Sequence, residues 1–214
     1  MKHWIFDLDG TLADSLTIHF QVLQRIFSGF GLDFSKEDQQ DILRISSRDF
    51  PKYLETKLGT QDGSQAYQLY QKFNQETLKD VQCFPGIVDL LQTLKTQGAQ
   101  LAIWTARDFE ATQEILKHTG LGIHFSICVT GSCVSQGKPN PEGLVKIADH
   151  FGCEPESMVM VGDFDSDMLG AKAFGIKAIR VLWHSAVPAK KCDIAAWQFT
   201  QVSDLKQWVD QREF

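Results

Sequence analysis

Short and nearly continuous apolar runs recur along the chain, and the segments between the later runs carry apolar residues at helical spacing. Runs of this kind indicate strands buried on both faces of a parallel sheet, because such strands do not alternate between polar and apolar residues. We predict strands at His3 to Leu8, Gln100 to Thr105, Phe125 to Thr130, Met158 to Asp163, and Ile176 to Trp183.

Helical patterns separate the later predicted strands. One begins at Pro85 and ends before Gly98, and another begins at Asn140 and closes at Gly152, since proline favours the first turn of a helix and glycine its end. The tail from Ser203 to Phe214 has the pattern of a last packing helix. Strand, helix and strand in repetition predict the α/β class, with a doubly wound, Rossmann-like parallel sheet.

The segment from residue 15 to residue 80 breaks this alternation. It holds helical patterns only, is rich in glutamine and charged residues, and is punctuated by glycines. The simplest interpretation is a helical domain inserted after the first strand. We therefore expect an α/β core domain from residues 1–14 and 81–214, and an all-helical domain from residues 15–80.

Composition narrows the possible partners. The chain has 214 residues, 43% of them hydrophobic and 22% charged, as is typical of a soluble globular protein, and its net charge is -6. This charge argues against a nucleic-acid partner, because no basic surface is available to neutralise a phosphate backbone. The five cysteines form no CxxC pair, which favours a reducing compartment. No apolar run approaches the roughly 18 residues of a membrane span, and no signal peptide precedes the first strand. We expect a cytoplasmic protein without a membrane partner.

Polar side chains follow the ends of the predicted strands. They are Asp7 and Asp9 after the first strand, Thr105 at the end of the second, Lys138 in the loop after the third, and Asp163, Asp165 and Asp167 after the fourth. Aspartate and glycine are also ordinary turn formers, so the first of these stretches alone fits a simple turn equally well. In an open parallel sheet, however, ligands bind beyond the carboxyl ends of the strands, so these side chains are expected to converge.

Carboxylates gathered in one place stay ionised only if a cation lies among them. Oxygen ligands of this kind suit Mg²⁺, which is usually completed by water and a substrate phosphate. A hydroxyl and a lysine beside that cation are what a phosphoryl group requires, because its transfer depends on positioning and charge neutralisation. The pattern predicts a magnesium-dependent site that acts on a small phosphorylated metabolite.

Four stretches then carry a resemblance to a known family. DLDGT (Asp7 to Thr11), IWTAR with Thr105, GKPNPEG (Gly137 to Gly143) and VGDFDSDMLGAKAFG (Val161 to Gly175) resemble, in this order, the signature motifs of the haloacid dehalogenase superfamily. The inserted helical segment is similar to the helical cap of that superfamily, which closes over the site. Phosphoglycolate phosphatase-like enzymes are the nearest resemblance.

The resemblance implies a role for each motif residue. Asp7 would be the nucleophile that forms an aspartyl-phosphate, and Asp9 the acid and base. Thr105 and Lys138 would hold the phosphoryl oxygens during catalysis.

The same resemblance implies a metal site. Asp163, a carboxylate oxygen of Asp7 and the backbone carbonyl of Asp9 would bind Mg²⁺, and Asp167 would orient water or Lys138 from outside the first ligands.

Five further residues are candidates for substrate binding: Thr11, His19, Arg48, Ala106 and Arg107. Related phosphatases commonly continue motif two with Thr-Asn, so Ala106 removes one polar contact that Arg107 could replace. His19 lies in the first helix of the insert. Arg48 would share a helical face with Arg44 and could clamp a second anionic group.

We therefore predict a phosphoric monoester hydrolase that acts on phosphoglycolate or a sugar phosphate, as a monomer or homodimer. A dehalogenase would have no use for Asp9, Asp163 and Asp167. A phosphosugar mutase of the β-phosphoglucomutase type stays an alternative, because His19 and Arg48 resemble positions that such mutases use, although their motif four begins Glu-Asp where this chain has Gly162 before Asp163. A catalytically silent phosphate-binding module is the other alternative.

Overall fold

The computed structural model describes residues 2–43, 45, 49–59, 63–184, 187 and 192–212. The chain divides into two compact units. One unit comprises Met1–Asp14 and Gln82–Phe214, and the other comprises Ser15–Val81. Arg44 and Arg48, which we considered as anion-binding residues, lie outside the described residues.

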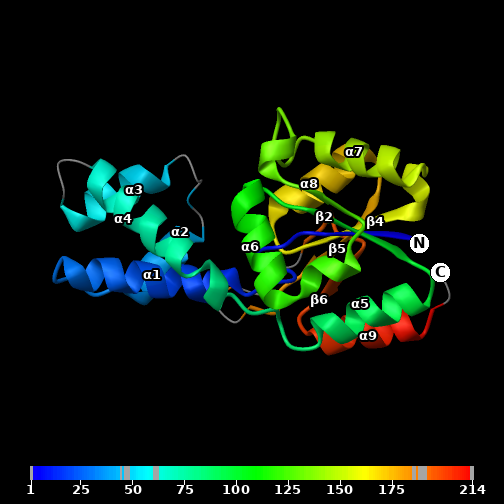
Figure 1. The fold of residues 1–214 in the computed structure, drawn as a ribbon, viewed down its shortest axis with the longest axis horizontal. Coiled ribbons are helices and arrows are strands. Elements are labelled where there is room, and N and C mark those ends of the chain that lie inside the picture. Colours follow the sequence, from blue (N-terminus) through cyan, green and yellow to red (C-terminus); the bar gives the residue numbers. More distant parts are fainter. Residues whose placement is uncertain are drawn as a thin grey trace. The chain divides into compact units, whose positions relative to one another are not determined.

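A parallel six-stranded sheet forms the centre of the first unit (Figure 1), and this confirms the predicted fold class. The strands are β1 (His3–Phe6), β2 (Gln100–Trp104), β3 (Ile127–Val129), β4 (Met158–Gly162), β5 (Lys177–Val181) and β6 (Trp197–Phe199). The prediction missed β6, which pairs with β5 at the edge of the sheet. Its three residues are only partly buried or exposed, so it shows no continuous apolar run.

Helices cover both faces of this sheet. On one side lie α7 (Glu142–Phe151) and α8 (Asp165–Phe174), and on the other α5 (Ile87–Thr96) and α9 (Val202–Asp210), while α6 (Phe109–Thr119) follows β2 (Figure 1). Side chains of β1 alternate between the two layers. Ile5 belongs to the apolar cluster that includes residues of α7 and α8, whereas the Trp4 ring lies 6.5 Å from that of Trp208 in α9. Both faces are buried, as the continuous apolar runs require.

The second unit consists, in its described part, of helical elements: α1 (Ser15–Gly29), α2 (Lys36–Ile42), α3 (Phe50–Leu58), α4 (Gly63–Glu76) and the short 3₁₀ helix η1 (Leu78–Asp80). Apolar residues from α1, α3 and α4 form its own core, which contains Val22, Leu23, Ile26, Phe27, Phe50, Leu54, Leu58 and Ala66. Residues four apart in α3 and α1 face inward together, as expected for helices buried on one side. In the part of the chain that the structure describes, no helix is long and apolar enough to cross a membrane.

The strand order places the polar strand ends together. The order is β3-β2-β1-β4-β5-β6, so the chain leaves β1 toward one side of the sheet and returns to β4 on the other. Ligand sites of doubly wound sheets lie at such a switch point, beyond the carboxyl ends of the strands. Here the switch point lies between β1 and β4, whose ends carry Asp7 and Asp163.

Candidate active site

Asp7 continues β1 into the site. Its backbone N–H donates to the carbonyl of Val161 at 2.9 Å, so the pairing with β4 extends to this residue and fixes its position, and its side chain is buried. The chain then turns sharply at Gly10, which has a φ of 75°. A Cβ at Gly10 would collide with the carboxylate of Asp163. Glycine is therefore required here both for its backbone conformation and for the close approach of the two loops.

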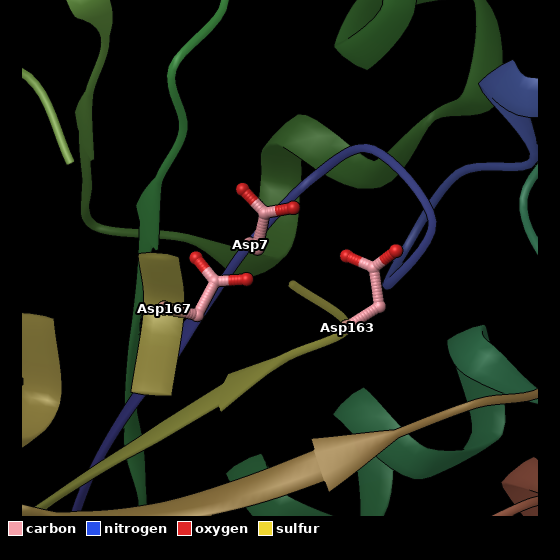
Figure 2. Close-up of side chains that lie close together, drawn as sticks. All are labelled: Asp7, Asp163 and Asp167. Atoms are coloured by element: carbon pink, nitrogen blue, oxygen red, sulfur yellow. The ribbon is translucent and has the colours of Figure 1, made fainter. Parts of the chain in front are cut away.

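Three carboxylates meet beyond the ends of β1 and β4. Asp7, Asp163 and Asp167 each offer an oxygen, and these atoms lie within 4.8 Å of one another. Figure 2 shows the three side chains gathered past the end of the β4 strand, with Asp167 coming from the first turn of α8. Burial, followed by repulsion from Asp7 and Asp167, raises the pKa of Asp163 well above its ordinary value. Positive charge near the cluster would therefore strongly stabilise its ionised form.

Lys138 supplies one positive charge to this cluster. Its Nζ donates to Oδ1 of Asp7 and to Oδ1 of Asp167, at 2.6 Å each, and its side chain is 4% exposed. Burial alone would lower the pKa of Lys138, but the carboxylates of Asp167 and Asp7 outweigh it and raise that pKa. Burial also raises the pKa of Asp7, although Lys138 opposes this shift. The lysine therefore stays charged as it donates to Asp7, the predicted nucleophile.

The loop that carries Lys138 is anchored by Glu142 at the start of α7. The Glu142 carboxylate accepts hydrogen bonds from the Ser135 hydroxyl at 2.6 Å and from the backbone N–H groups of Ser135 and Gln136. These bonds lower the pKa of Glu142 to about 2. The anchor holds the backbone directly before Lys138 without using any group of the site itself.

The two threonines of the motifs are fully buried at the same edge. The Thr105 backbone N–H donates to the carbonyl of Val129 at 3.0 Å, which extends β2 by one residue. Its hydroxyl oxygen accepts from the backbone N–H of Arg107 at 3.1 Å. The Thr11 hydroxyl lies 3.4 Å from Oδ1 of Asp163. Ala106, between Thr105 and Arg107, is exposed.

Asp9 and Arg107 form a second group of charges at this edge. The guanidinium of Arg107 binds the Asp9 carboxylate with two nitrogens: Nη2 lies 2.6 Å from Oδ1, and Nε lies 3.0 Å from Oδ2. Asp9 and Arg107 thus lie at the same edge of the sheet as the three aspartates. The Asp9 carboxylate, however, is not among the described oxygens that form the three-aspartate cluster. Only its backbone carbonyl was predicted as a metal ligand, and its carboxylate is paired with Arg107.

His19, a predicted substrate residue, lies in the second unit. Its Nδ1 is 2.9 Å from the hydroxyl of Tyr70 in α4, and its ring lies against Phe50 and Tyr70, at centroid distances of 5.6 and 5.3 Å. The structure thus places His19 in an aromatic cluster of that unit, which gives the residue a packing role within its own domain.

Two residues without a predicted role support the first motif. The indole Nε1 of Trp183 donates to the carbonyl of Thr11 at 3.1 Å, and Nε2 of His184 lies 3.3 Å from a carboxylate oxygen of Asp14. Both residues follow β5, so their position past the end of a strand was the signal that could have identified them. They fix the loop between Asp7 and Asp14 from the β5 side of the sheet.

The fold and the site define a class of protein. It is a doubly wound α/β protein whose switch point gathers buried carboxylates, a buried lysine and buried threonine hydroxyls, with an inserted helical unit after the first strand. This is the arrangement expected of an enzyme site, because buried charge is costly unless it is paired, and groups of such charges with shifted pKa values cluster at functional sites.

Comparisons with known proteins identify the family. Residues 4–181 match the model of the haloacid dehalogenase-like hydrolase family. The phosphorylated carbohydrates phosphatase of Thermotoga maritima is 26% identical, with 86% of this chain and 87% of that protein covered. The phosphoglycolate phosphatase of Aquifex aeolicus is 28% identical, with 86% and 85% covered. A putative β-phosphoglucomutase from Thermotoga maritima has the same fold, with a TM-score of 0.85 at 21% identity and 99% of each chain covered.

The chain therefore belongs to the haloacid dehalogenase-like hydrolase family, as its motifs predicted. The two relatives just named are phosphatases, and the predicted enzyme class, a phosphoric monoester hydrolase, is confirmed.

Proposed function

We propose that the protein is a magnesium-dependent phosphatase that hydrolyses a small phosphomonoester through a phosphorylated Asp7. The observation that carries this proposal is the position of Lys138, whose ammonium bridges Asp7 and Asp167 at 2.6 Å each beside Asp163. A nucleophilic carboxylate needs a nearby cation, because the phosphoryl group that it attacks is itself anionic.

The donor set fits Mg²⁺. Carboxylate oxygens are hard ligands that this ion prefers, and the three described oxygens of Asp7, Asp163 and Asp167 lie close enough to surround one site. The pKa of Asp163 is raised by its burial and by the neighbouring carboxylates even though Lys138 is close. This supports the binding of a further cation, of higher charge than Lys138, beside Asp163. Asp163, Asp7 and the backbone carbonyl of Asp9 would hold the ion, and Asp167 would stay with Lys138. When bound, Mg²⁺ neutralises the charge of the phosphoryl oxygens.

In the first step a carboxylate oxygen of Asp7 attacks phosphorus. The phosphorus–oxygen bond to the leaving group breaks as the new bond to Asp7 forms, and Asp9 donates its proton to the leaving oxygen. Lys138 and the Thr105 hydroxyl bind the phosphoryl oxygens through this step, which stabilises the charge of the transition state.

In the second step water replaces Asp7. Asp9, now ionised, takes a proton from the water as its oxygen attacks phosphorus, and the bond between phosphorus and the Asp7 oxygen breaks. Inorganic phosphate leaves, Asp7 is again a carboxylate, and Asp9 again carries a proton. The positions of Asp7 at the end of β1 and Asp9 two residues later allow one group to attack and the other to transfer protons on the same short loop.

Arg107 would bind the substrate. Its guanidinium forms a two-point contact with the Asp9 carboxylate, and Asp9 must be released from this pair when it carries a proton as the acid. An anionic or hydroxyl group of the substrate can take its place on the guanidinium, because guanidinium binds phosphate and carboxylate in the same forked geometry. Small phosphorylated acids and sugars, the chemistry named in the relatives, offer such groups. Roles in substrate binding for Thr11, Ala106, His19 and Arg48 stay predictions.

A phosphate-release assay tests this function. The panel would contain phosphoglycolate, hexose phosphates, nucleoside monophosphates, pyrophosphate and a generic aryl phosphate, each with Mg²⁺ and with a chelator. Asp7→Asn is expected to abolish turnover, while the control Asp149→Asn, which changes an exposed residue of α7, should keep it. Magnesium-dependent release that is lost in Asp7→Asn supports the proposal.

Other outcomes identify the alternatives. Isomerisation of a sugar phosphate without phosphate release would show a mutase. An Asp7→Asn variant that turns over substrate at the wild-type rate would exclude a phosphorylated Asp7. If no substrate reacts, binding of beryllium fluoride to the carboxylate of Asp7, detected by fluorine NMR, would distinguish an enzyme with an untested substrate from a catalytically silent module.

A further inference from the structure

Trp104 lies directly beneath the buried charges of the site. It is the last residue of β2, immediately before Thr105, and it is 1% exposed. The Nζ of Lys138 lies 4.8 Å from the centre of the indole ring. This is within the range in which the negative face of an aromatic ring attracts a cation, and tryptophan provides the strongest attraction of the aromatic residues. The ammonium thus has carboxylates on one side and an indole face on another.

Two glycines make the space for this ring. A Cβ at Gly143 in α7 would collide with the indole Nε1, and one at Gly170 in α8 would lie 2.5 Å from its Cη2 atom. Neither glycine has a positive φ, so their backbone conformations do not require glycine. Glycine inside a helix is unfavourable compared with alanine, and here the indole accounts for its presence. Helices α7 and α8 therefore both pack closely against the Trp104 ring of β2.

The indole provides a contact that does not change during the reaction. The proposed cycle changes one partner of Lys138, because phosphorylation converts the Asp7 carboxylate into an acyl phosphate in which the negative charge lies on the phosphoryl oxygens. Lys138 would then contact the phosphoryl oxygens and Asp167 in place of the Asp7 carboxylate. The face of Trp104 keeps the same charge distribution throughout, and its rigid position between two helices limits the movement of the flexible lysine side chain.

We infer that Trp104 is a positioning residue for Lys138, holding the ammonium toward the phosphoryl group through the face of its indole ring. This inference rests on the proposed phosphatase function. It adds a residue to the catalytic arrangement that acts through another residue and touches no substrate atom.

Fluorinated tryptophans test the inference while leaving the shape of the site nearly unchanged. Tryptophan with one, two and three ring fluorines would be incorporated at position 104 by codon suppression, since fluorine weakens the negative face stepwise. The expected result is a stepwise fall in kcat for phosphate release, reaching about threefold to tenfold for the most fluorinated ring, with an unchanged Tm. The matched control is the same series at Trp4, a buried residue of β1 whose ring faces Phe6 and Trp208.

Each result has a distinct meaning. A wild-type protein that releases no phosphate and binds no beryllium fluoride at Asp7 would contradict the proposed function itself. An active wild type with a flat series at position 104, or with equal losses at positions 4 and 104, would overturn the inference and leave the proposed function intact. A fall confined to position 104 would support it.

A second test does not depend on turnover. The ε-methylene protons of Lys138, assigned by their loss in a Lys138→Arg variant, should resonate upfield because of the indole ring current, and Trp104→Leu should return them to the ordinary position. Gly170→Ala should also reduce this upfield shift and lower kcat, since its new methyl group displaces the ring. The control Gly122→Ala, whose Cβ would meet its nearest atom at 3.7 Å, should do neither. Lysine protons at the ordinary position in the wild type would overturn the inference.

Discussion

The two groups of opposite charges at the sheet edge differ in burial and in geometry. Lys138, Asp7 and Asp167 have side chains that are 4%, 10% and 1% exposed, and the lysine is a point charge shared by two carboxylates. In the pair of Arg107 with Asp9 the exposed fractions are 18% and 33%, and the contact is a fork on one carboxylate. Charges removed from water interact strongly and rearrange at high cost, whereas a half-exposed pair can exchange partners.

This difference suggests that the two groups of charges have different roles in the reaction. The buried group lies at the switch point between β1 and β4 and suits the part of the reaction that every phosphomonoester shares. In the half-exposed pair, Arg107 follows β2 beside the exposed Ala106 and Asp9 follows β1, and this pair suits the part of the substrate that varies. Predictions that affect one group and spare the other can therefore break or sharpen this comparison.

The largest effect is expected from Lys138→Met. Loss of one positive donor at the phosphoryl group should lower kcat by about 10²- to 10³-fold. Because Asp7 and Asp167 are left buried without their cation, the unfolding free energy of the metal-free protein should fall by about 3–5 kcal/mol. Steady-state kinetics with Mg²⁺ measures the change in kcat. Urea denaturation in chelator measures the change in the free energy of unfolding.

The matched control is Lys172→Met, which removes an exposed lysine of α8. It should leave both quantities near the wild-type values. A Lys138→Met enzyme within about threefold of the wild-type kcat would show that the buried group does not carry the shared chemistry.

Arg107→Ala should act mainly on substrate binding. Loss of a charge-assisted contact predicts a rise in KM of about tenfold or more, with a smaller change in kcat. Arg107→Lys should recover part of this loss, because a lysine keeps the charge but not the fork. The measurement is steady-state kinetics on the best substrate of the panel. A fall in kcat with an unchanged KM would instead assign Arg107 to proton transfer through Asp9, and the proposed difference in roles would be wrong.

Several of the buried polar residues at the sheet edge could be predicted from the sequence. Asp7, Thr105 and Asp163 each follow an apolar run, and parallel strands bring their carboxyl ends to one edge whatever the details of packing. The helical insert was equally visible, because its periodicity changes at Ser15. These features depend on local patterns and on one rule of topology.

The supporting contacts could not be predicted in the same way. In the sequence, Trp104 looks like any other apolar residue of a strand. Its contact with Lys138 depends on two helices that leave space for the ring at Gly143 and Gly170. The hydrogen bond from Trp183 to Thr11 joins residues that are 172 positions apart. The edge strand β6 was missed because its three residues are only partly buried or exposed and form no continuous apolar run. Such features are set by tertiary packing, which a single sequence does not display.

The stability of the metal-free protein should depend on pH through the buried group. The pKa of Asp163 is raised in the folded state, so the folded protein binds this proton more tightly than the unfolded chain does. Its stabilising contribution is complete below the ordinary pKa of 3.8 and is lost as pH rises through the raised value. In chelator, Tm should therefore fall as pH rises from 3.8 through the raised pKa of Asp163, and Mg²⁺ should reverse the fall because it binds the ionised form.

Two variants separate the two groups of charges in this experiment. Asp163→Asn should reduce the pH dependence to the part that the raised pKa of Asp7 contributes, and it should remove the response of Tm to Mg²⁺. Arg107→Ala should change neither by much, because the half-exposed pair lies outside the described carboxylate cluster. Thermal unfolding monitored by tryptophan fluorescence gives both results, and an undiminished Mg²⁺ response in Asp163→Asn would place the ion elsewhere.

The smallest effect is expected from Glu142→Gln. Glu142 touches no charge of the buried group, but its carboxylate fixes the backbone at Ser135 and Gln136, just before Lys138. Its pKa is lowered to about 2 by these hydrogen bonds. The stabilisation is therefore present above the ordinary value of 4.5 and is lost as pH falls toward 2.

Glu142→Gln should thus remove part of the acid sensitivity of the wild type, seen as a smaller loss of Tm as pH falls from 4.5 to about 2. At neutral pH it should lower kcat by less than about tenfold, since a small displacement of Lys138 weakens but does not remove its contact with the phosphoryl group. Glu156→Gln, which changes an exposed residue of the 3₁₀ helix η4 (Pro155–Ser157), is the control. If Glu142→Gln and Glu156→Gln are indistinguishable, the position of Lys138 does not depend on its loop. The carboxylates and the indole around the ammonium would then be sufficient to hold it.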